Sequence, residues 1–234
     1  MSLFVTGSES FIGKNLIAHC DAEGIPVSGI DAAVSSSGRF VHGDISDASV
    51  ADAIPEGATI VHLAAISRDP DCRADPQRAF QVNMDGTLNL AAAARRRSAK
   101  QFIFASSEWV YGDVRNDETQ VEDQAIDLTA MRSEYAITKL AAEQILRLSF
   151  ADLPVSVLRF GIVYGPRDSN WSAFEAMASN VYNGKDIKVG SARTARRFIH
   201  VDDIVSGIMA VRGQPGFGIY NLSGDTLISL GDVV

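Results

Sequence analysis

Two side chains that could move a proton lie four positions apart in the chain. Tyr135 and Lys139 fall within residues 134–150, where apolar residues recur at intervals of three and four, as they do on a helix. Residues at this spacing share a helix face, so the lysine ammonium would lie beside the tyrosine phenol. A neighbouring positive charge stabilises a phenolate, and one unit of lowered pKa is worth about 1.4 kcal/mol. The pair therefore predicts a tyrosine that acts as a general base near pH 7.

A hydroxyl-rich segment strengthens this prediction, because Tyr-x-x-x-Lys by itself also arises by chance on amphipathic helices. Residues 106–109, with the sequence Ser-Ser-Glu-Trp, follow the apolar run 102–105, which is typical of a strand. A hydroxyl at this strand end can bridge a substrate oxygen to Tyr135. Ser107, Tyr135 and Lys139 together predict the catalytic centre of a hydride-transfer enzyme.

A glycine-spaced turn joins the first strand to the first helix. Residues 3–6 form an apolar run, Gly7 to Gly13 form the turn, and helical periodicity follows over residues 11–22. The backbone N–H groups of such a turn can face a pyrophosphate, and a side chain at Gly7 or Gly13 would block the approach or the helix packing. Ser10 stands where the usual pattern has its middle glycine. An ordinary turn is the alternative interpretation.

Two carboxylates follow the next two strands. Asp31 comes 18 positions after Gly13, at the end of the second apolar run. It can accept hydrogen bonds from the adenosine ribose hydroxyls and would repel a 2′-phosphate, which favours NAD over NADP. Asp44 follows the third run, where its carboxylate can meet the adenine amino group while Ile45 packs on the ring. A solvated turn aspartate is an equal alternative for Asp44.

Most of the candidate residues follow strand-like runs, and a sheet formed by these strands would bring them together. Strand-like runs at 3–6, 27–30, 40–42, 59–63, 102–105 and 155–159 alternate with helical stretches at 11–22, 76–97 and 134–150. This alternation predicts an α/β fold, a Rossmann-like doubly wound parallel sheet with right-handed crossovers. We expect residues 1–165 to form an NAD-binding Rossmann domain and residues 166–234 a small, apparently truncated substrate-binding lobe interleaved with it. The predicted lobe holds helices at 171–182 and 203–211, strands at 187–189 and 220–221, and a final helical turn that breaks off.

Composition excludes several classes of protein. The 234 residues are 46% hydrophobic and 21% charged, with a net charge of −8, which describes a globular chain without the basic patch that nucleic-acid binding needs. The apolar runs fall far short of the roughly 18 residues that cross a bilayer, and no secretory signal is recognisable. Cys20 and Cys72 lie outside any metal-ligand spacing and fit a reducing compartment. We therefore expect a cytoplasmic protein without metal, nucleic acid or membrane.

With its further motifs, the whole chain resembles the extended short-chain dehydrogenases of the nucleotide-sugar epimerase and dehydratase type. The additional motifs are Val-His-Leu-Ala-Ala at 61–65, Asn83, Gly86-Thr87, Tyr-Gly-Pro at 164–166, Arg-Phe-Ile-His-Val-Asp-Asp at 197–203 and Tyr-Asn-Leu-Ser-Gly at 220–224. The resemblance also implies a homodimer. The apolar helix faces at 87–94 and 136–145 exceed what one sheet face needs, which suits a helix bundle between two subunits.

Carried over position by position, the resemblance implies a set of site residues. The NAD-binding set is Gly7, Ser10, Phe11, Ile12, Gly13, Asp31, Asp44, Ile45, Leu63, Ala64, Ala65, Asn83, Ala105, Ser106, Tyr135 and Lys139. Ser107, Tyr135 and Lys139 would be catalytic, and Lys139 would also hold the nicotinamide ribose. The nucleotide-sugar substrate would meet Ser107, Glu108, Trp109 and Arg196. Arg196 would face its diphosphate as a planar donor.

Departures from the family pattern narrow the predicted reaction. The 4,6-dehydratases carry an Asp-Glu pair after the catalytic hydroxyl residue, as acid for the 6-hydroxyl and base for the C5 proton. Here Glu108 and Trp109 occupy those places, and an indole cannot take a proton. The same tryptophan disfavours the nucleotide-sugar decarboxylases, which have glutamate there. Ile162 stands where relatives commonly have an asparagine that bonds the diphosphate, so the substrate's identity stays open.

The sequence therefore predicts an NAD-dependent nucleotide-sugar epimerase that acts at C4 through a 4-keto intermediate. Two alternatives remain: a nucleotide-sugar 4-keto reductase or dehydrogenase, and a non-catalytic NAD- or nucleotide-binding module that lacks a complete substrate lobe. His62 and His200 sit in apolar runs, which favours structural roles over catalytic ones. Trp171 and Phe174 either flank the sugar nucleotide or close the smaller lobe, and the sequence favours neither.

Overall fold

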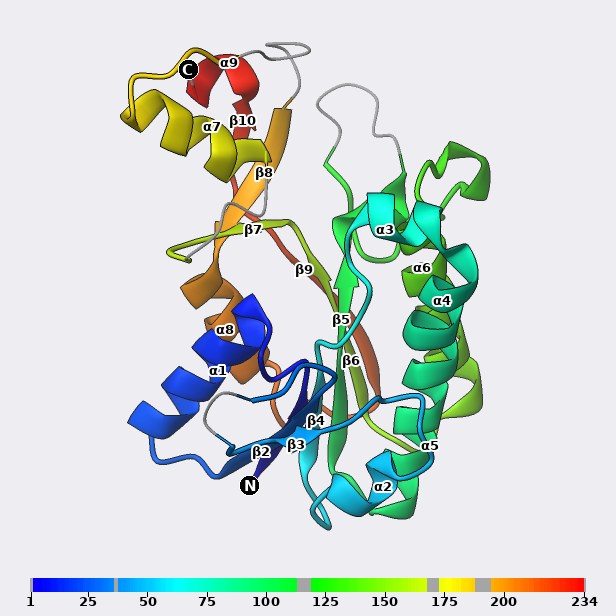
Figure 1. Cartoon of the computed structure of the whole chain (residues 1–234). Helices are drawn as coiled ribbons and strands as arrows, with labels where there is room; N and C mark the ends of the chain where they lie inside the picture. Colours follow the sequence, from blue (N-terminus) through cyan, green and yellow to red (C-terminus); the bar gives the residue numbers. More distant parts are fainter. Residues whose placement is uncertain (1, 36–37, 113–118, 168–172, 188–194, 234) are drawn as a thin grey trace.

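A computed structural model describes residues 2–35, 38–112, 119–167, 173–187 and 195–233 of the chain. Its main feature is one large sheet of parallel strands in the order β3-β2-β1-β4-β5-β6-β9 (Figure 1). The strands are β1 (Leu3–Thr6), β2 (Val27–Asp31), β3 (Val41–His42), β4 (Thr59–His62), β5 (Gln101–Ser107), β6 (Val155–Phe160) and β9 (Phe217–Leu222). The predicted Rossmann-like, doubly wound parallel sheet is confirmed.

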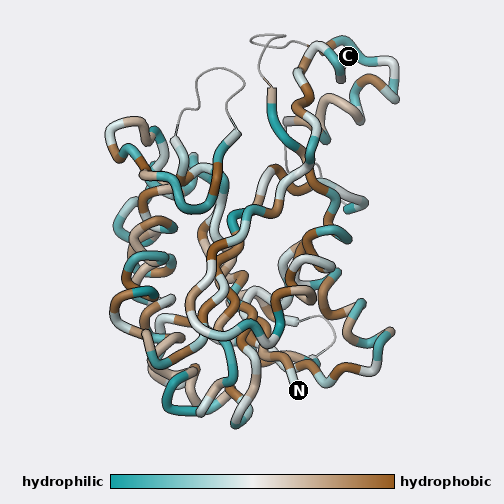
Figure 2. Tube along the Cα trace, turned by 180° about the vertical axis from the view of Figure 1, so that it is seen from behind, coloured by the Kyte–Doolittle hydropathy of each residue, from teal (hydrophilic) through white to brown (hydrophobic). Residues whose placement is uncertain are grey.

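Helices cover both faces of this sheet (Figure 1). The helices α1 (Phe11–Ala22) and α8 (Val201–Ala210) pack on one face; α2 (Val50–Ala53), α4 (Pro76–Phe80), α5 (Thr87–Arg96) and α6 (Glu134–Ser149) lie on the other. Successive residues of a strand point to opposite faces, so Leu3 and Val5 join the core under α1, whereas Phe4 joins the core under α5. Figure 2 shows hydrophobic residues gathered along the central strands.

A second, smaller sheet lies beyond the carboxyl ends of the large sheet's strands (Figure 1). It contains β7 (Ile162–Tyr164), β8 (Ala195–His200) and β10 (Leu227–Ser229) in the order β10-β8-β7, with α7 (Ala173–Tyr182) and α9 (Leu230–Val233) beside it. The strand β8 runs parallel to β7 and antiparallel to β10.

The chain crosses between the two sheets more often than the sequence indicated. The predicted helix at 203–211 and strand at 220–221 correspond to α8 and β9, which complete the large sheet rather than the smaller lobe. The hydrophobic side chains of α8 explain this, because Ile204 and Ile208 are fully buried against α1 and the large sheet. The predicted strand at 187–189 is not seen at residue 187, and residues 188–189 lie outside the described ranges.

One predicted helix has an irregular centre. The sequence predicts a single helix over 76–97, and the structure divides it into α4, a π-helical segment (Gln81–Gly86) and α5. The short helix α3 (Asp69–Ala74) precedes it. Single-turn π segments inside α-helices often lie at functional sites. Within the described ranges, no helix combines the length and apolar character needed to span a bilayer.

Candidate functional site

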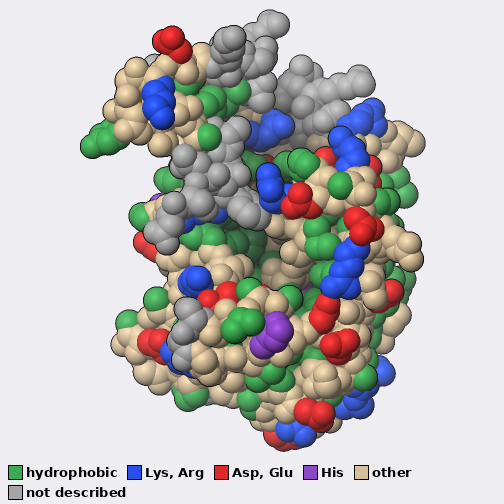
Figure 3. All heavy atoms as spheres, viewed as in Figure 1, with side chains coloured by type: hydrophobic (Ala, Val, Ile, Leu, Met, Phe, Trp, Pro, Cys, Tyr) green, Lys and Arg blue, Asp and Glu red, His purple; other side chains and the backbone are tan. Residues whose placement is uncertain are grey.

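A cavity of about 370 Å³ lies where the first four strands end. In an open parallel sheet, ligands bind outside the carboxyl ends of the strands, at the point where the strand order reverses. Here that point lies between β1 and β4. Figure 3 shows the molecule hollowed in this region, between the part carrying α1 and the part carrying α4. The cavity is lined by Gly7, Glu9, Ser10, Asp31, Ala32, Ala33, Gly43, Asp44, Ile45, Leu63, Ala64, Ala65, Ile66, Ser67, Arg78 and Val82.

The passage from β1 into α1 requires Gly7 in the turn and Gly13 in the first turn of the helix. Gly7 has a φ of +71°, and a Cβ added there would come within 2.9 Å of the backbone nitrogen of Ala64. A Cβ on Gly13 would lie 2.2 Å from the carbonyl oxygen of Gly7. Ser10 caps the helix, because its hydroxyl oxygen accepts the backbone N–H of Gly13 at 3.1 Å. The predicted close packing at both glycines is confirmed, and Ser10 has a structural role of its own.

The carboxylate of Asp31 is fixed at the end of β2. One oxygen accepts the backbone N–H of Glu9 and the other that of Ala33, each at 2.8 Å. The first bond ties the end of β2 to the glycine turn. A fixed carboxylate beside a narrow helix-capping turn fits the ribose and pyrophosphate of a dinucleotide. The residues present therefore fit the adenosine half of NAD.

Asp44 is held just as firmly in the loop after β3. One carboxylate oxygen accepts both the backbone N–H and the hydroxyl of Ser46, at 2.9 and 2.7 Å, and the other accepts from Arg78 at 2.5 Å. Burial raises the pKa of Asp44, but the hydrogen bonds from Ser46 and Arg78 outweigh it, so the pKa lies below its ordinary value. The sequence did not indicate Arg78, whose guanidinium lines the cavity from α4.

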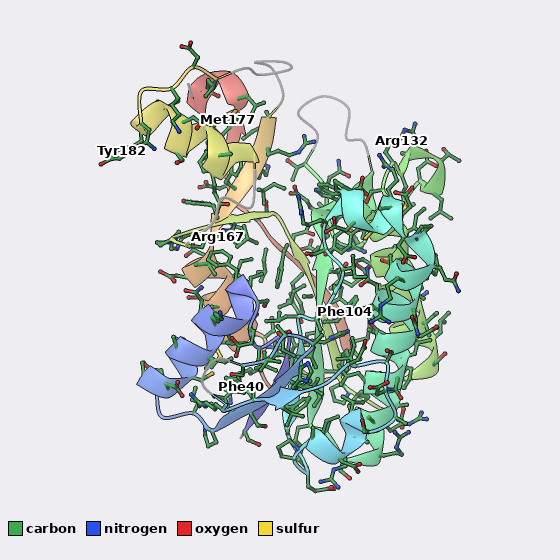
Figure 4. The ribbon with its side chains drawn as sticks, in the orientation of Figure 1. Phe40, Phe104, Arg132, Arg167, Met177 and Tyr182 are labelled. Carbon is green, nitrogen blue, oxygen red and sulfur yellow. The ribbon has the colours of Figure 1, made fainter. Side chains whose placement is uncertain are left out.

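The predicted catalytic residues lie where β5 meets the start of α6. Ser107 ends β5, and its hydroxyl accepts the backbone N–H of Trp109 at 3.2 Å. The Trp109 and Tyr135 rings meet edge to face, with centroids 6.4 Å apart. The Lys139 ammonium lies 5.7 Å from the Tyr135 ring centroid and 4.7 Å from that of Phe104, the β5 residue labelled in Figure 4.

Burial dominates the titration of the tyrosine and the lysine. It raises the pKa of Tyr135 above its ordinary value, and it lowers the pKa of Lys139 from 10.5 to about 7, although the nearby Glu143 carboxylate acts in the opposite direction. A low-dielectric environment disfavours the charged form of both groups. The expectation that the lysine gives Tyr135 a pKa near neutrality is therefore wrong for this structure.

Glu108 is a second group with a shifted pKa beside the catalytic residues. Burial raises its pKa from 4.5 to about 7, against the opposing charges of Arg196 and Arg197. Both arginines belong to β8 of the smaller sheet, so charges on that sheet act on Glu108, which directly follows β5 of the large sheet. The side chain of Arg197 donates to the backbone carbonyls of Gly224 and Asp225.

A buried ion pair that sequence reasoning missed supports the catalytic helix. Glu143 of α6 and Arg159 of β6 are 0% and 2% exposed, and their closest nitrogen and oxygen lie 2.7 Å apart. Ser106 donates its hydroxyl proton to Glu143, and Arg159 donates to the Tyr111 hydroxyl oxygen at 2.8 Å. The only sequence signal is a charged residue inside the apolar run 155–160.

Eight predicted cofactor residues line the cavity: Gly7, Ser10, Asp31, Asp44, Ile45, Leu63, Ala64 and Ala65. The others, Phe11, Ile12, Gly13, Asn83, Ala105, Ser106, Tyr135 and Lys139, lie outside its lining. The buried Asn83 amide instead exchanges hydrogen bonds with the backbone of Ile66, at 2.9 and 3.0 Å. Phe11 packs under the guanidinium of Arg167, whose central carbon lies 4.0 Å from the Phe11 ring centroid. Arg167 is labelled in Figure 4.

His62 and His200, two of the chain's four histidines, lie in structural networks. Thr87 donates its hydroxyl proton to the carbonyl of Asn83, so the neighbouring Nε2 of His62 must donate to Thr87. Burial holds the pKa of His62 well below its ordinary value. His200 caps α8. Phe174 meets Tyr164 edge to face and packs on the tilted ring of Phe198 in the smaller lobe, whereas Trp171 lies outside the described residues. The described ranges contain no group of three or more His, Cys, Asp or Glu side chains suited to a metal ion.

The sequence model of the NAD dependent epimerase/dehydratase family matches residues 3–223. The chain is 28% identical over 257 residues to a dTDP-glucose 4,6-dehydratase of Streptomyces antibioticus, covering 100% of this chain and 75% of that protein. It is 32% identical over 244 residues to a UDP-glucose 4-epimerase of Mycolicibacterium smegmatis, covering 93% and 75%. The structure of a Thermus thermophilus UDP-glucose 4-epimerase in complex with NAD superposes with a TM-score of 0.87 at 26% identity, covering 100% of this chain and 81% of that chain.

Proposed function

The chain belongs to the NAD-dependent epimerase/dehydratase family, and we propose that within it the chain epimerises a nucleotide sugar at C4 through a 4-keto intermediate. The relatives include both epimerases and dehydratases, so the choice between the two reactions depends on the site. The observation that carries the proposal is the indole of Trp109 against the ring of Tyr135. A dehydratase would need a carboxylate at position 109 to take the C5 proton, and an epimerase would not.

Each catalytic residue has a proposed role in proton transfer. The Tyr135 phenol exchanges a proton with the sugar 4-hydroxyl, and the Ser107 hydroxyl holds the same oxygen by a hydrogen bond. Lys139, whose pKa is about 7, exchanges protons at neutral pH and can balance the charge that develops on the phenol. When bound, NAD supplies reversible hydride transfer at its nicotinamide ring.

Both ends of the substrate have candidate partners in the structure. We place the sugar beside the contacting rings of Trp109 and Tyr135, and the nucleotide diphosphate towards Arg196, whose side chain is exposed on β8. Guanidinium groups bind phosphate oxygens through paired hydrogen bonds. A carboxylate at Glu108 would compete with the diphosphate for Arg196, and its raised pKa reduces that competition near pH 7. The NAD site is proposed within residues 1–165, and the sugar nucleotide is placed between the two sheets.

The test follows the sugar itself rather than the cofactor. The purified chain is incubated with UDP-, dTDP- and GDP-sugars and substoichiometric NAD, and the anomeric protons are followed by NMR. We expect interconversion of one pair of sugars beyond the NAD supplied. Tyr135→Phe should lower the rate by at least about a hundredfold, as expected for loss of a general acid–base residue. Tyr182→Phe, at a tyrosine that is 91% exposed on α7, is the matched control.

The same experiment separates the competing functions. Steady accumulation or consumption of NADH would identify a dehydrogenase or 4-keto reductase, and loss of the 6-hydroxyl would identify a dehydratase. Binding of NAD without turnover of any sugar in the panel would support the binding module. Full activity in Tyr135→Phe would refute the assigned role of this tyrosine.

A further inference from the structure

The adenosine side of the cavity contains a polar cluster that the proposed catalytic cycle does not use. It consists of Asp44 and Ser46 in the loop after β3, and Arg78 and Gln81 at the end of α4 and the start of the π segment. Asp44 and Arg78 both line the cavity, as do Gly7 and Asp31. Because β3 is the outer strand on this side of the switch point, the cluster lies towards the base end of a dinucleotide.

Among the described residues, the hydrogen bonds within the cluster leave one lone-pair site of the Asp44 carboxylate available to a ligand. An ionised carboxylate offers about four lone-pair sites, two on each oxygen. Ser46 fills both sites of Oδ1, with its backbone N–H at 2.9 Å and its hydroxyl at 2.7 Å. Among the described residues, Arg78 occupies one site of Oδ2 through Nη2 at 2.5 Å. The acceptor site left over is on the oxygen that Arg78 holds.

Arg78 is itself held by a second contact. Its Nη1 donates to Oε1 of Gln81 at 2.9 Å, while Nη2 donates to Asp44. Two nitrogens of one planar guanidinium are therefore tied to different elements, which fixes the plane of the group. Of the described residues that line the cavity, Arg78 alone is cationic, against the carboxylates of Glu9, Asp31 and Asp44.

We propose that Arg78 is a positioning residue that fixes Asp44 as a reader of the adenine 6-amino group, so that the cofactor site selects adenine over a 6-oxopurine. A fixed carboxylate accepts from an amino group and repels a carbonyl oxygen. A site built to hydrogen-bond an N–H group rejects an analogue that lacks it much more strongly than a purely apolar pocket does. The inference rests on the proposed NAD site and adds the residue that sets its base selectivity.

The test compares NAD with nicotinamide hypoxanthine dinucleotide, which has an oxygen in place of the 6-amino group. Affinities of the full chain for both are measured by isothermal titration calorimetry, without any sugar. We expect the wild type to bind NAD about 10- to 100-fold more tightly, the range for a hydrogen bond to a charged group. Arg78→Met should weaken NAD binding and bring the two affinities within about threefold of each other.

Three further variants make the result specific. Arg78→Lys keeps the positive charge but loses the planar guanidinium group, which donates two hydrogen bonds from different nitrogens. It should therefore keep only part of the selectivity for adenine. Asp44→Asn should abolish the preference, because an amide presents either a donor or an acceptor to the base. Arg95→Met is the matched control, since Arg95 is a half-exposed arginine that pairs with Asp152 at 3.6 Å and does not line the cavity. It should leave both affinities unchanged.

The outcomes separate this inference from the proposed function. An unchanged ratio in Arg78→Met, or equal weakening of both dinucleotides, would overturn the positioning role while leaving the NAD site in place. A preference for the hypoxanthine analogue in the wild type would do the same. Failure of the folded wild type to bind either dinucleotide would instead refute the cofactor site and the proposed function with it. Melting curves of each variant without ligand identify folding defects.

Discussion

Lys139 connects the chemistry of the site to the stability of the fold. It is 1% exposed, and burial lowers its pKa from 10.5 to about 7. Below pH 7 the folded and unfolded chains both hold the proton, and between pH 7 and 10.5 only the unfolded chain holds it. Stability rises with pH wherever the unfolded state binds more protons. Lys139 therefore penalises folding most at low pH, and the penalty falls as the pH rises through this window.

This linkage predicts a pH-dependent difference between the wild type and Lys139→Met. The free energy of unfolding of the wild type, relative to the variant, should rise by roughly 2 to 3 kcal/mol between pH 7 and pH 9. Urea unfolding at several pH values measures it. Lys100→Met, at an exposed lysine, should show no such trend relative to the wild type. A flat difference for Lys139→Met would mean that the lysine stays charged in the folded protein.

The spacing of residues in the sequence predicted some members of the candidate site and missed others. Tyr135, Lys139 and Ser107 could be found because a helical interval and a strand end suffice to place them near one another. Arg78 could not be found, because its importance depends on a contact with Asp44 across 34 positions. The pKa of Tyr135 was also beyond the sequence, since it depends on burial rather than on the neighbouring lysine.

At the scale of elements, the Glu143–Arg159 pair joins α6 to β6 behind the catalytic residues. The pair is buried, and two hydrogen bonds of 2.7 and 3.2 Å link its guanidinium to its carboxylate. Arg159 also reaches Tyr111, whose hydroxyl donates to Asn221 of β9 at 2.8 Å. Ser106 of β5 also donates to Glu143, so the three strands β5, β6 and β9 and the catalytic helix are connected through one charged pair. A buried pair adds little net stability, but loss of one partner leaves an uncompensated charge.

We therefore predict a strong asymmetry between single and double substitutions. Arg159→Met should lower the free energy of unfolding by about 3 to 5 kcal/mol, because it leaves the Glu143 carboxylate buried alone. Glu143→Leu combined with Arg159→Met should be less destabilising than Arg159→Met, since no charge is then left without a partner. Urea unfolding of the wild type, the single variants Arg159→Met and Glu143→Leu, and the double variant gives the coupling energy. Equal and additive losses would show that the two side chains act independently.

The elements themselves were predictable where local pattern determines them. The helix predicted at 11–22 agrees with α1, because Ser10 supplies an N-cap and the apolar spacing is regular. The π segment was not predictable, because Asn83 within it bonds Ile66 and Thr138 from other elements. The assignment of β9 to the large sheet was not predictable either, because it depends on a tertiary contact: β9 pairs with the whole length of β6.

At the scale of the whole molecule, the large sheet carries the expected cofactor and catalytic residues, and the smaller sheet carries an expected substrate residue. The large sheet brings the glycine turn, Asp31 and Asp44 to one side of the switch point, and Ser107 with α6 to the other side. The smaller sheet contains β8, whose Arg196 and Arg197 charges act on Glu108. The chain passes from the large sheet to the smaller one between β6 and β7, returns between β8 and β9, and passes to the smaller sheet again between β9 and β10.

The outer face of the helices on the α5 side carries apolar side chains that the chain does not bury. Phe80 of α4 and Ile137 of α6 are each 44% exposed, and Leu148, further along α6, is 71% exposed. Ile137 and Leu148 share a face because eleven positions are close to three helical turns. Scattered exposed apolar residues are ordinary, but a stripe along packed helices is typical of an isologous subunit interface. The predicted homodimer should therefore form through this face.

Sedimentation velocity over a range of protein concentrations tests the dimer. The wild type should sediment as a dimer at micromolar concentration, and Ile137→Glu combined with Leu148→Glu should shift it to monomer, because two buried carboxylates at a symmetric interface would repel one another. Val181→Glu, at a residue of α7 that is also 44% exposed, is the control and should remain dimeric. A wild type that stays monomeric throughout, or a control that dissociates equally, would contradict the assignment of this face. Dissociation without loss of NAD binding would further show that each subunit carries a complete cofactor site, as the cavity lining within one chain predicts.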